Sequence, residues 1–258
     1  DDVTLLGPDA GDQACGEVGD GRMLEPEDIV EQLIGFFQPK LLRGHRVLLT
    51  AGPTFEPIDP VRGITNLSSG KMGFALARAA AQAGAEVTLV AGPCHQDTPA
   101  GVLRIDVQTA QQMHDAVMHE LDTAKNDIFI AVAAVADWRV AQAAEHKLKK
   151  QSDADVPSLT FTQNPDILAA VARRPKAPFC VGFAAETERL EEFGEAKRQK
   201  KGIPLLVGNL GHQTFGRDDN EVALFDAKGI TRLPRADKLT LARQIVAAIA
   251  DRVHGAQS

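Results

Sequence analysis

The sequence has no long hydrophobic run, few cysteines and no excess of positive charge. No apolar run approaches the roughly 18 residues of a membrane-spanning helix, and the acidic start, DDVTLLGPDAGDQACGEVGDG, is unlike a secretory signal peptide. We therefore expect a cytoplasmic protein with no membrane partner. Its three cysteines, Cys15, Cys94 and Cys180, are too few and too widely spaced for a disulfide framework or a CxxC zinc site.

The formal net charge of −7 argues against a general nucleic-acid-binding protein, which would carry a basic patch. Basic residues are nevertheless concentrated in HKLKK (146–150) and KRQKK (197–201). A single lysine run usually forms a solvated face. Two runs in an acidic chain, each beside a predicted strand end, favour a polyanionic small-molecule ligand.

A strand, a long loop, an Ala-rich helix and a second strand follow one another from residue 45 to residue 91. The loop contains neither the G-x-x-x-x-G-K-[ST] of a phosphate loop nor the G-x-G-x-x-G of a dinucleotide site. It has no evident structure of its own, and such long loops are usually functional or disordered. Its prolines, serines and glycines favour a shaped binding loop over a solvated connection.

Apolar runs rich in β-branched residues alternate with helical patterns, which predicts an α/β fold with a doubly wound, mostly parallel, Rossmann-like sheet. In such folds the ligand lies at the carboxyl ends of the strands. The expected strands are 46–51, 86–91, 102–107, 127–135, 179–184 and 204–208, and the expected helices are 71–83, 108–124, 165–173, 188–201 and 236–253.

Three segments depart from this alternation. Residues 221–234 predict a C-terminal β-hairpin that turns at Lys228-Gly229. Residues 141–163 have a polar middle between extended pieces and predict a mobile flap or a small strand pair. The first 38 residues predict a glycine-rich loop and one amphipathic helix, which cannot bury a core alone.

Five ordered motifs carry a family resemblance: AGPTFEPIDPVRGITNLSSGKMG, AAVADWR, KLKK, NPDIL and GFAAET. Over about residues 40–253 the chain closely resembles phosphopantothenate-cysteine ligase, the second activity of the bifunctional bacterial coenzyme A biosynthesis protein. The leading QACGEVGDGRMLEP resembles the end of the flavin-dependent decarboxylase half. The resemblance therefore implies a decarboxylase remnant at 1–38 and a ligase domain at 39–258.

The resemblance implies a CTP-dependent ligation. The carboxylate of 4'-phosphopantothenate would attack CTP to give an acyl-cytidylate and pyrophosphate, and the amine of L-cysteine would then release CMP. Mg²⁺ is the implied cofactor, FMN belongs to the missing decarboxylase domain, and the ligase domain is expected to form a homodimer. The alternatives are a Rossmann-type oxidoreductase, which the absent glycine fingerprint opposes, and a non-catalytic assembly domain.

The resemblance implies two catalytic residues. Asn66 would hold the acyl-cytidylate while cysteine attacks, whereas a turn or helix cap is its ordinary role. Lys147 would lie on a flap and stabilise phosphate charge rather than act as a base, because neighbouring phosphates favour its charged form. Cys15 matches the decarboxylase proton donor, but the rest of that site is absent, so we expect no decarboxylation.

The resemblance also implies a nucleotide site, in which small residues after a buried strand allow close approach and Asp137 binds ribose hydroxyls or Mg²⁺. The helix start after Asn164 and a possible packing of Phe183 on the pyrimidine complete it. Without the resemblance, Asn-Pro-Asp is an ordinary helix start and Phe183 an ordinary core residue. The implied nucleotide-binding residues are Ala131, Val132, Ala133, Asp137, Lys147, Pro165, Asp166, Ile167, Leu168, Phe183, Lys197 and Lys201.

Overall fold

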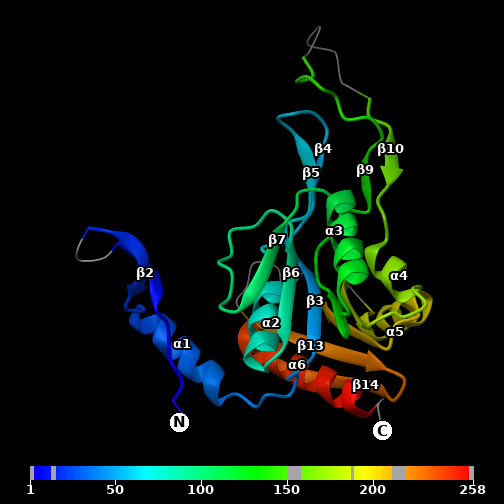
Figure 1. Ribbon diagram of the computed structural model, residues 1–258. Coiled ribbons are helices and arrows are strands. Elements are labelled where there is room, and N and C mark those ends of the chain that lie inside the picture. The colour runs from blue at the N-terminus through cyan, green and yellow to red at the C-terminus, as the bar shows by residue number, and fades with distance from the viewer. Residues whose placement is uncertain (1–2, 13–15, 150–157, 187–188, 211–218, 256–258) are drawn as a thin grey trace.

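An eight-stranded sheet with helices on both faces forms the centre of the computed structural model (Figure 1). The structure describes residues 3–12, 16–149, 158–186, 189–210 and 219–255. The strand order across the sheet is β14-β13-β12-β11-β8-β3-β6-β7. Its strands are β3 (Arg46–Ala51), β6 (Glu86–Ala91), β7 (Val102–Asp106), β8 (Ile128–Ala131), β11 (Phe179–Glu186), β12 (Leu205–Leu210), β13 (Asp219–Asp226) and β14 (Gly229–Asp237).

Six neighbouring strands, β12-β11-β8-β3-β6-β7, pair in parallel. Strand β13 runs opposite to them and pairs antiparallel with both β12 and β14. The chain moves outward from β3 through β6 to β7 and then returns to the other side of β3 at β8. This reversal leaves a crevice outside the carboxyl ends of β3 and β8, where ligands of such sheets bind. The predicted doubly wound α/β fold and the C-terminal hairpin are confirmed.

Two apolar cores fill the two sides of the sheet. On one side, α2 (Lys71–Gln82) and α6 (Lys238–Gly255) pack against inward residues such as Leu49, Val181 and Val207. On the other side, α3 (Ala110–Thr123), α4 (Ile167–Ala172) and α5 (Leu190–Lys201) cover Leu48, Phe129 and their neighbours. Alternate residues along each strand face opposite cores, which explains the nearly continuous apolar runs in the sequence.

Helix α2 lies unusually close to strand β3. A Cβ atom on Gly73 would lie 2.4 Å from the Cβ of Ala51, so only glycine permits this approach. Gly70 precedes the helix with a φ of 76°, in the left-handed region that favours glycine. The glycines of SSGKMG therefore bring the start of α2 to the carboxyl end of β3.

Two small hairpins extend beyond the carboxyl ends of the sheet (Figure 1). Strand β4 (Phe55–Pro57) pairs with β5 (Gly63–Thr65), and β9 (Trp138–Val140) pairs with β10 (Phe161–Gln163), both antiparallel. We call residues 55–65, 138–149 and 158–163 the arm. The predicted flap region thus begins with a strand pair, although its first strand precedes residue 141 and residues 150–157 lie outside the described chain.

The N-terminal segment contains the hairpin β1 (Asp9–Asp12) and β2 (Val18–Arg22), followed by α1 (Pro26–Phe37). Helix α1 has no buried residue, as expected for a segment that cannot form a core. It meets α2 through Glu31, which pairs with Arg78 and accepts a hydrogen bond from Gln82. Among the described residues, no helix combines the length and apolar character needed to cross a membrane.

Several predicted boundaries are wrong for local reasons. The strand predicted at 127–135 ends at Ala131, because the chain then bends to give Ala134 a bridge to Pro53. The loop at 52–70, predicted without structure, contains the β4–β5 hairpin. The C-terminal hairpin turns at residues 227–228, one residue early, since Asp226 pairs with Gly229 and accepts a hydrogen bond from the Lys228 amide.

Candidate active site

A cavity of about 250 Å³ lies at the carboxyl ends of β3, β8, β11 and β12, on the side of α2 and α6. It occupies the crevice expected from the reversal of strand order. Its lining combines small residues, apolar residues and two lysines. The lining residues are Gly52, Ser68, Ser69, Gly70, Lys71, Met72, Gly73, Val132, Ala133, Ala134, Val135, Phe183, Ala184, Ala185, Asn209, Asn220, Val222 and Lys238.

Residues 132–134 form one wall, and hydrogen bonds to β3 and the residue after it fix its backbone. The amides of Val132 and Ala134 donate to the carbonyls of Thr50 and Gly52, at 3.3 and 2.9 Å. The amide of Ala133 donates to Thr50 Oγ1 at 3.3 Å. Because these residues are small and their backbone is fixed, a ligand can approach the wall closely.

Asn66 is held at the edge of this wall. Its Nδ2 donates to the carbonyl oxygen of Ala134, a cavity residue, at 2.9 Å, and the residue as a whole is exposed. The same carbonyl accepts the Thr54 amide at 3.3 Å. An exposed amide fixed beside a cavity can orient a polar group of a bound molecule, as the predicted role of Asn66 requires.

Another part of the cavity lining is polar. Lys71 at the start of α2 and Lys238 at the start of α6 contribute positive charge, and Ser68 and Ser69 contribute hydroxyls. Both helices direct their N-terminal ends here, and helix N-termini favour anions. Asn220, which is 4% exposed, lies beside them. The arrangement can hold a molecule with at least one anionic group.

The residues predicted for the nucleotide fall into three places. Val132, Ala133 and Phe183 line the cavity, beside Ala131 at the end of β8. Asp137 immediately precedes the second segment of the arm and Lys147 lies on it, and both are exposed. Six lie on the side of α4 and α5: Pro165, Asp166, Ile167, Leu168, Lys197 and Lys201.

Asp166 is the centre of the group on α4 and α5. Its carboxylate caps α4 by accepting the Ala169 amide at 3.1 Å and forms an ion pair with Lys201. Burial raises the pKa of this carboxyl, but the bonds from Lys201 and Ala169 outweigh it, so the pKa lies below its ordinary value. Leu168 packs over Gly182: a Cβ atom on Gly182 would lie 2.8 Å from Leu168 Cδ2. Asp166 and Leu168 therefore also have structural roles.

Asp137 lies where β9 begins, and its carbonyl accepts the Asn164 amide at 2.9 Å. No group of three His, Cys, Asp or Glu side chains that could hold a metal ion occurs within the described ranges. Magnesium is often held by one or two carboxylates and by phosphate oxygens of the substrate. The single exposed carboxylate of Asp137 fits Mg²⁺ only in that form. Cys15 lies outside the described residues.

The sequence prediction did not include the two cavity lysines among the site residues. Lys71 follows the TNLSSG motif directly, so its position after the loop glycine was an available signal. Lys238 starts the last helix, 167 residues later in the chain, and no local pattern connects the two.

The chain belongs to the family of DNA/pantothenate metabolism flavoprotein C-terminal domains, whose model matches residues 42–253. Thus the matched region begins at Leu42, a fully buried core residue that precedes β3.

Relatives of greater length carry this domain. The chain is 52% identical to the coenzyme A biosynthesis bifunctional protein CoaBC of Vibrio cholerae over 244 residues, which cover 93% of this chain and 61% of the relative. It is 45% identical to the protein of the same name from Escherichia coli over 256 residues, covering 97% and 63%. The chain therefore spans about three fifths of the length of these relatives.

Solved structures show the same fold. The crystal structure of the C-terminal domain of a CoaBC protein matches with a TM-score of 0.71 at 35% identity, covering 84% of this chain and 99% of that one. A Cab2 variant in complex with phosphopantothenate-cysteine matches with a TM-score of 0.69 at 17% identity, covering 89% and 94%. At that identity the second match shows a shared fold.

Proposed function

We propose that this chain is a phosphopantothenate-cysteine ligase domain that uses CTP. The carboxylate of 4'-phosphopantothenate attacks the α-phosphorus of CTP, pyrophosphate leaves, and an acyl-cytidylate forms. The amine of L-cysteine then attacks the acyl carbon, CMP leaves, and 4'-phosphopantothenoylcysteine results. The observation that carries the proposal is the cavity at the strand reversal, which two lysines line and beside which the Asn66 amide is fixed to the carbonyl of Ala134.

The charge of the substrates explains why such a site is needed. Both 4'-phosphopantothenate and CTP are anions, so their approach requires cations where negative charge accumulates. Lys71 and Lys238 line the cavity, and Lys147 is exposed on the arm. In this proposal Lys147 stabilises the phosphates of CTP, and Asn66 orients the acyl-cytidylate during attack by cysteine. The names of the relatives, which refer to coenzyme A biosynthesis, support the assignment.

Asp137 would hold Mg²⁺ by its carboxylate when the nucleotide is bound, with further oxygens from the phosphates of CTP. The ion neutralises phosphate charge when bound. Asp166 and the lysines of α5 hold another part of the nucleotide, which requires exchange of the Asp166–Lys201 ion pair for contacts to the ligand.

The first 38 residues, in this proposal, belong to a flavin-dependent decarboxylase domain that precedes the ligase in the longer protein. Helix α1 contributes no buried residue to the fold, as a segment of a neighbouring domain would. We expect no decarboxylation by this chain when FMN is added. Product carrying the decarboxylated cysteine moiety would contradict this assignment.

A homodimer is the proposed assembly. The arm exposes three large apolar side chains, with Val61 at 63%, Trp138 at 58% and Phe161 at 52% exposure. Sizing of the chain by light scattering tests the dimer, and a clean monomer at micromolar concentration would contradict it.

Pyrophosphate release tests the reaction directly. The chain is assayed with 4'-phosphopantothenate, Mg²⁺ and either CTP or ATP, with and without cysteine. We expect release that favours CTP, with CMP and the amide product formed when cysteine is present. Release with ATP alone would overturn the nucleotide assignment, and no release from folded protein would overturn the ligase. A thermal shift with NAD would instead favour the oxidoreductase alternative.

The variant Lys147→Gln tests the predicted phosphate role. Because Lys147 is exposed and supports no core, we expect an unchanged fold and a loss of at least about 100-fold in pyrophosphate release. Lys125→Gln is the control, since Lys125 is a 90% exposed lysine at the other end of the sheet. Normal turnover by Lys147→Gln would remove the lysine from the mechanism.

The variant Asn66→Asp tests the second half-reaction. The added negative charge near the intermediate should slow attack by cysteine more than formation of the acyl-cytidylate. We therefore expect more trapped acyl-cytidylate than in the unsubstituted chain after quenching. An equal or smaller amount would contradict the role proposed for Asn66.

A further inference from the structure

Asp59 is a buried carboxylate in the loop that joins β4 to β5. Its side chain has no exposed surface, although this loop lies in the arm and its neighbours Pro60, Val61 and Arg62 are exposed. Aspartate is seldom buried so completely unless its charge is paired and hydrogen-bonded. The position therefore depends on specific partners.

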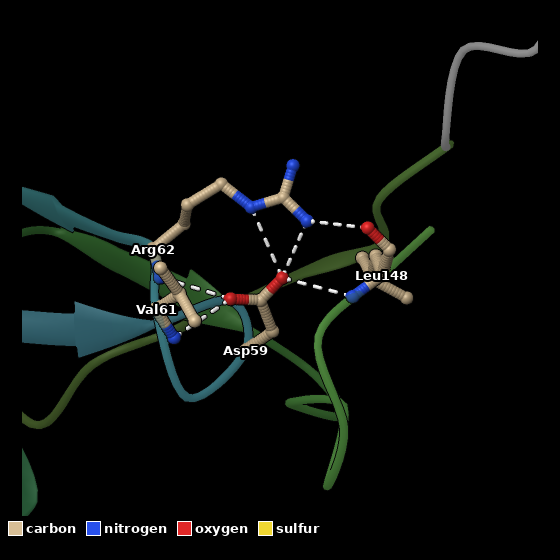
Figure 2. Close-up of polar contacts among 4 residues, drawn as sticks. All are labelled: Asp59, Val61, Arg62 and Leu148. Carbon is tan, nitrogen blue, oxygen red and sulfur yellow. Dashed lines mark hydrogen bonds and ion pairs between the residues drawn. The ribbon is translucent and has the colours of Figure 1, made fainter. Parts of the chain in front are cut away.

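Five hydrogen bonds from three residues satisfy the Asp59 carboxylate (Figure 2). Its Oδ1 accepts the amides of Val61 and Arg62, each at 2.9 Å. Its Oδ2 accepts Arg62 Nε at 3.0 Å, Arg62 Nη2 at 2.5 Å and the Leu148 amide at 3.1 Å. One oxygen thus shapes the loop, and the other reaches a segment 89 residues away.

Arg62 completes the contact with that distant segment. Its Nη2 also donates to the carbonyl oxygen of Leu148 at 2.9 Å (Figure 2). Asp59 and Arg62 therefore hold both main-chain polar groups of Leu148, the residue immediately after Lys147. A third bond, from the Ala144 amide to the Ile58 carbonyl at 2.9 Å, joins the same two parts of the arm.

We propose that Asp59 is a positioning residue, which holds the main chain of Leu148 directly and through Arg62 and thereby fixes Lys147 where it meets the nucleotide. This inference rests on the proposed function, because Lys147 has its role only in that reaction. Asp59 itself touches no reacting atom. An exposed lysine on a chain segment without such contacts would sample many positions, and orientation of a charged group strongly affects rate.

The charge of Asp59 matters for this role. Hydrogen bonds from Arg62 hold the pKa of the Asp59 carboxyl well below its ordinary value, against the opposing effect of burial. The group is therefore ionised at neutral pH. In Asp59→Asn one oxygen becomes an NH₂ group, which accepts no hydrogen bond, and the remaining oxygen is uncharged, so the Leu148 amide loses its charged acceptor in either orientation of the side chain.

Amide hydrogen exchange at Leu148 tests the contact without any assay of activity. We expect exchange at least about tenfold faster in Asp59→Asn than in the unsubstituted chain, because the amide loses a charged acceptor. Asp226→Asn is the matched control. Asp226 likewise accepts a nearby amide, that of Lys228 at 2.7 Å, and an arginine, Arg252, but it lies at the turn between β13 and β14. Unchanged Leu148 exchange in Asp59→Asn would overturn the proposal.

A double-substitution cycle tests the connection to Lys147. Asp59→Asn should lower the kcat for pyrophosphate release by about tenfold, with a smaller change in the KM for 4'-phosphopantothenate. In the Lys147→Gln background the same substitution should change the residual rate less than twofold, because the group that it positions is gone. Equal effects in the two backgrounds would show that Asp59 acts on the whole fold, and would overturn the proposal.

The two readouts separate the possible failures. If the unsubstituted chain releases no pyrophosphate with CTP, the proposed function fails, whereas Leu148 exchange still reports whether Asp59 holds the segment. If pyrophosphate release is normal and Asp59→Asn changes neither its rate nor Leu148 exchange, the positioning role alone fails. Circular dichroism confirms that each variant is folded before either comparison is made.

Discussion

The sheet and the arm are held together by different kinds of interaction. Most buried residues of the sheet and its helices are apolar, with side chains such as Phe129 and Leu49 fully enclosed. In the arm, by contrast, only three described residues are buried, and two of them are the carboxylates Glu56 and Asp59. The third is Val140, at 7% exposure.

This difference separates stability from function along one chain. Apolar burial is non-directional and supports the sheet as a whole. The arm depends on a few directional bonds, each of which fixes one contact, such as Glu56 to α3 or Asp59 to Leu148. A substitution in the arm should therefore change the placement of a particular segment, and a substitution in the sheet should change the stability of the fold.

The largest effect is expected in the sheet. Phe129→Ala removes a fully buried ring from the central strand β8 and should lower the free energy of unfolding by about 3–5 kcal/mol. Phe161→Ala in β10 is the comparison, because that ring is 52% exposed, and its cost should be below about 1 kcal/mol. Denaturant titration measures both. Similar costs would mean that the arm and the sheet share one apolar core.

A smaller effect is expected where the arm meets α3. Glu56 is 1% exposed, and its Oε1 accepts the Ala110 amide at 2.9 Å at the start of that helix. Glu56→Ala leaves this buried donor unpaired and should cost about 1–3 kcal/mol. Glu56→Gln keeps an acceptor at the helix N-terminus and should cost less. Equal costs for the two variants would show that side-chain packing, rather than the hydrogen bond, attaches the arm.

The contrast also explains what could be predicted from the sequence. Strands such as 46–51 and 86–91 were found to the residue, because apolar runs bounded by turn residues reflect the core. The hairpin β4–β5 was missed, since three-residue strands that end in proline or begin with glycine carry no alternating pattern. Gly63 is needed because a Cβ there would lie 2.3 Å from the Phe55 ring.

The lining of the candidate cavity could be predicted from the sequence only in part, for similar reasons. The small residues after β8 and Phe183 were expected at the carboxyl ends of the strands, and they line the cavity. The burial of Asp59 was not expected, because an acidic residue in a proline-rich loop is ordinarily exposed and its partner Leu148 lies 89 residues away. Whether Asn66, Lys147 and the residues of α4 and α5 bind the nucleotide remains a prediction for the assays above.

The smallest effect on the free energy of unfolding is expected for a surface carboxylate on α5, one of the helices that cover the sheet. Glu195 on α5 accepts bonds from Arg198 at 2.7 Å and from Gln199 at 2.8 Å, and these lower its pKa from 4.5 to about 2. A depressed pKa contributes stability that is complete above pH 4.5 and is lost as the pH falls toward 2. Because the side chain is 35% exposed, Glu195→Gln should cost less than about 1 kcal/mol at pH 7. The difference from the unsubstituted chain should shrink as unfolding is measured from pH 5 to pH 3. If the difference in unfolding free energy did not depend on pH, Glu195 would contribute through packing of its methylene groups rather than through its charge. The surface carboxylate would then not act through ionic hydrogen bonds, as we propose for the buried carboxylates of the arm.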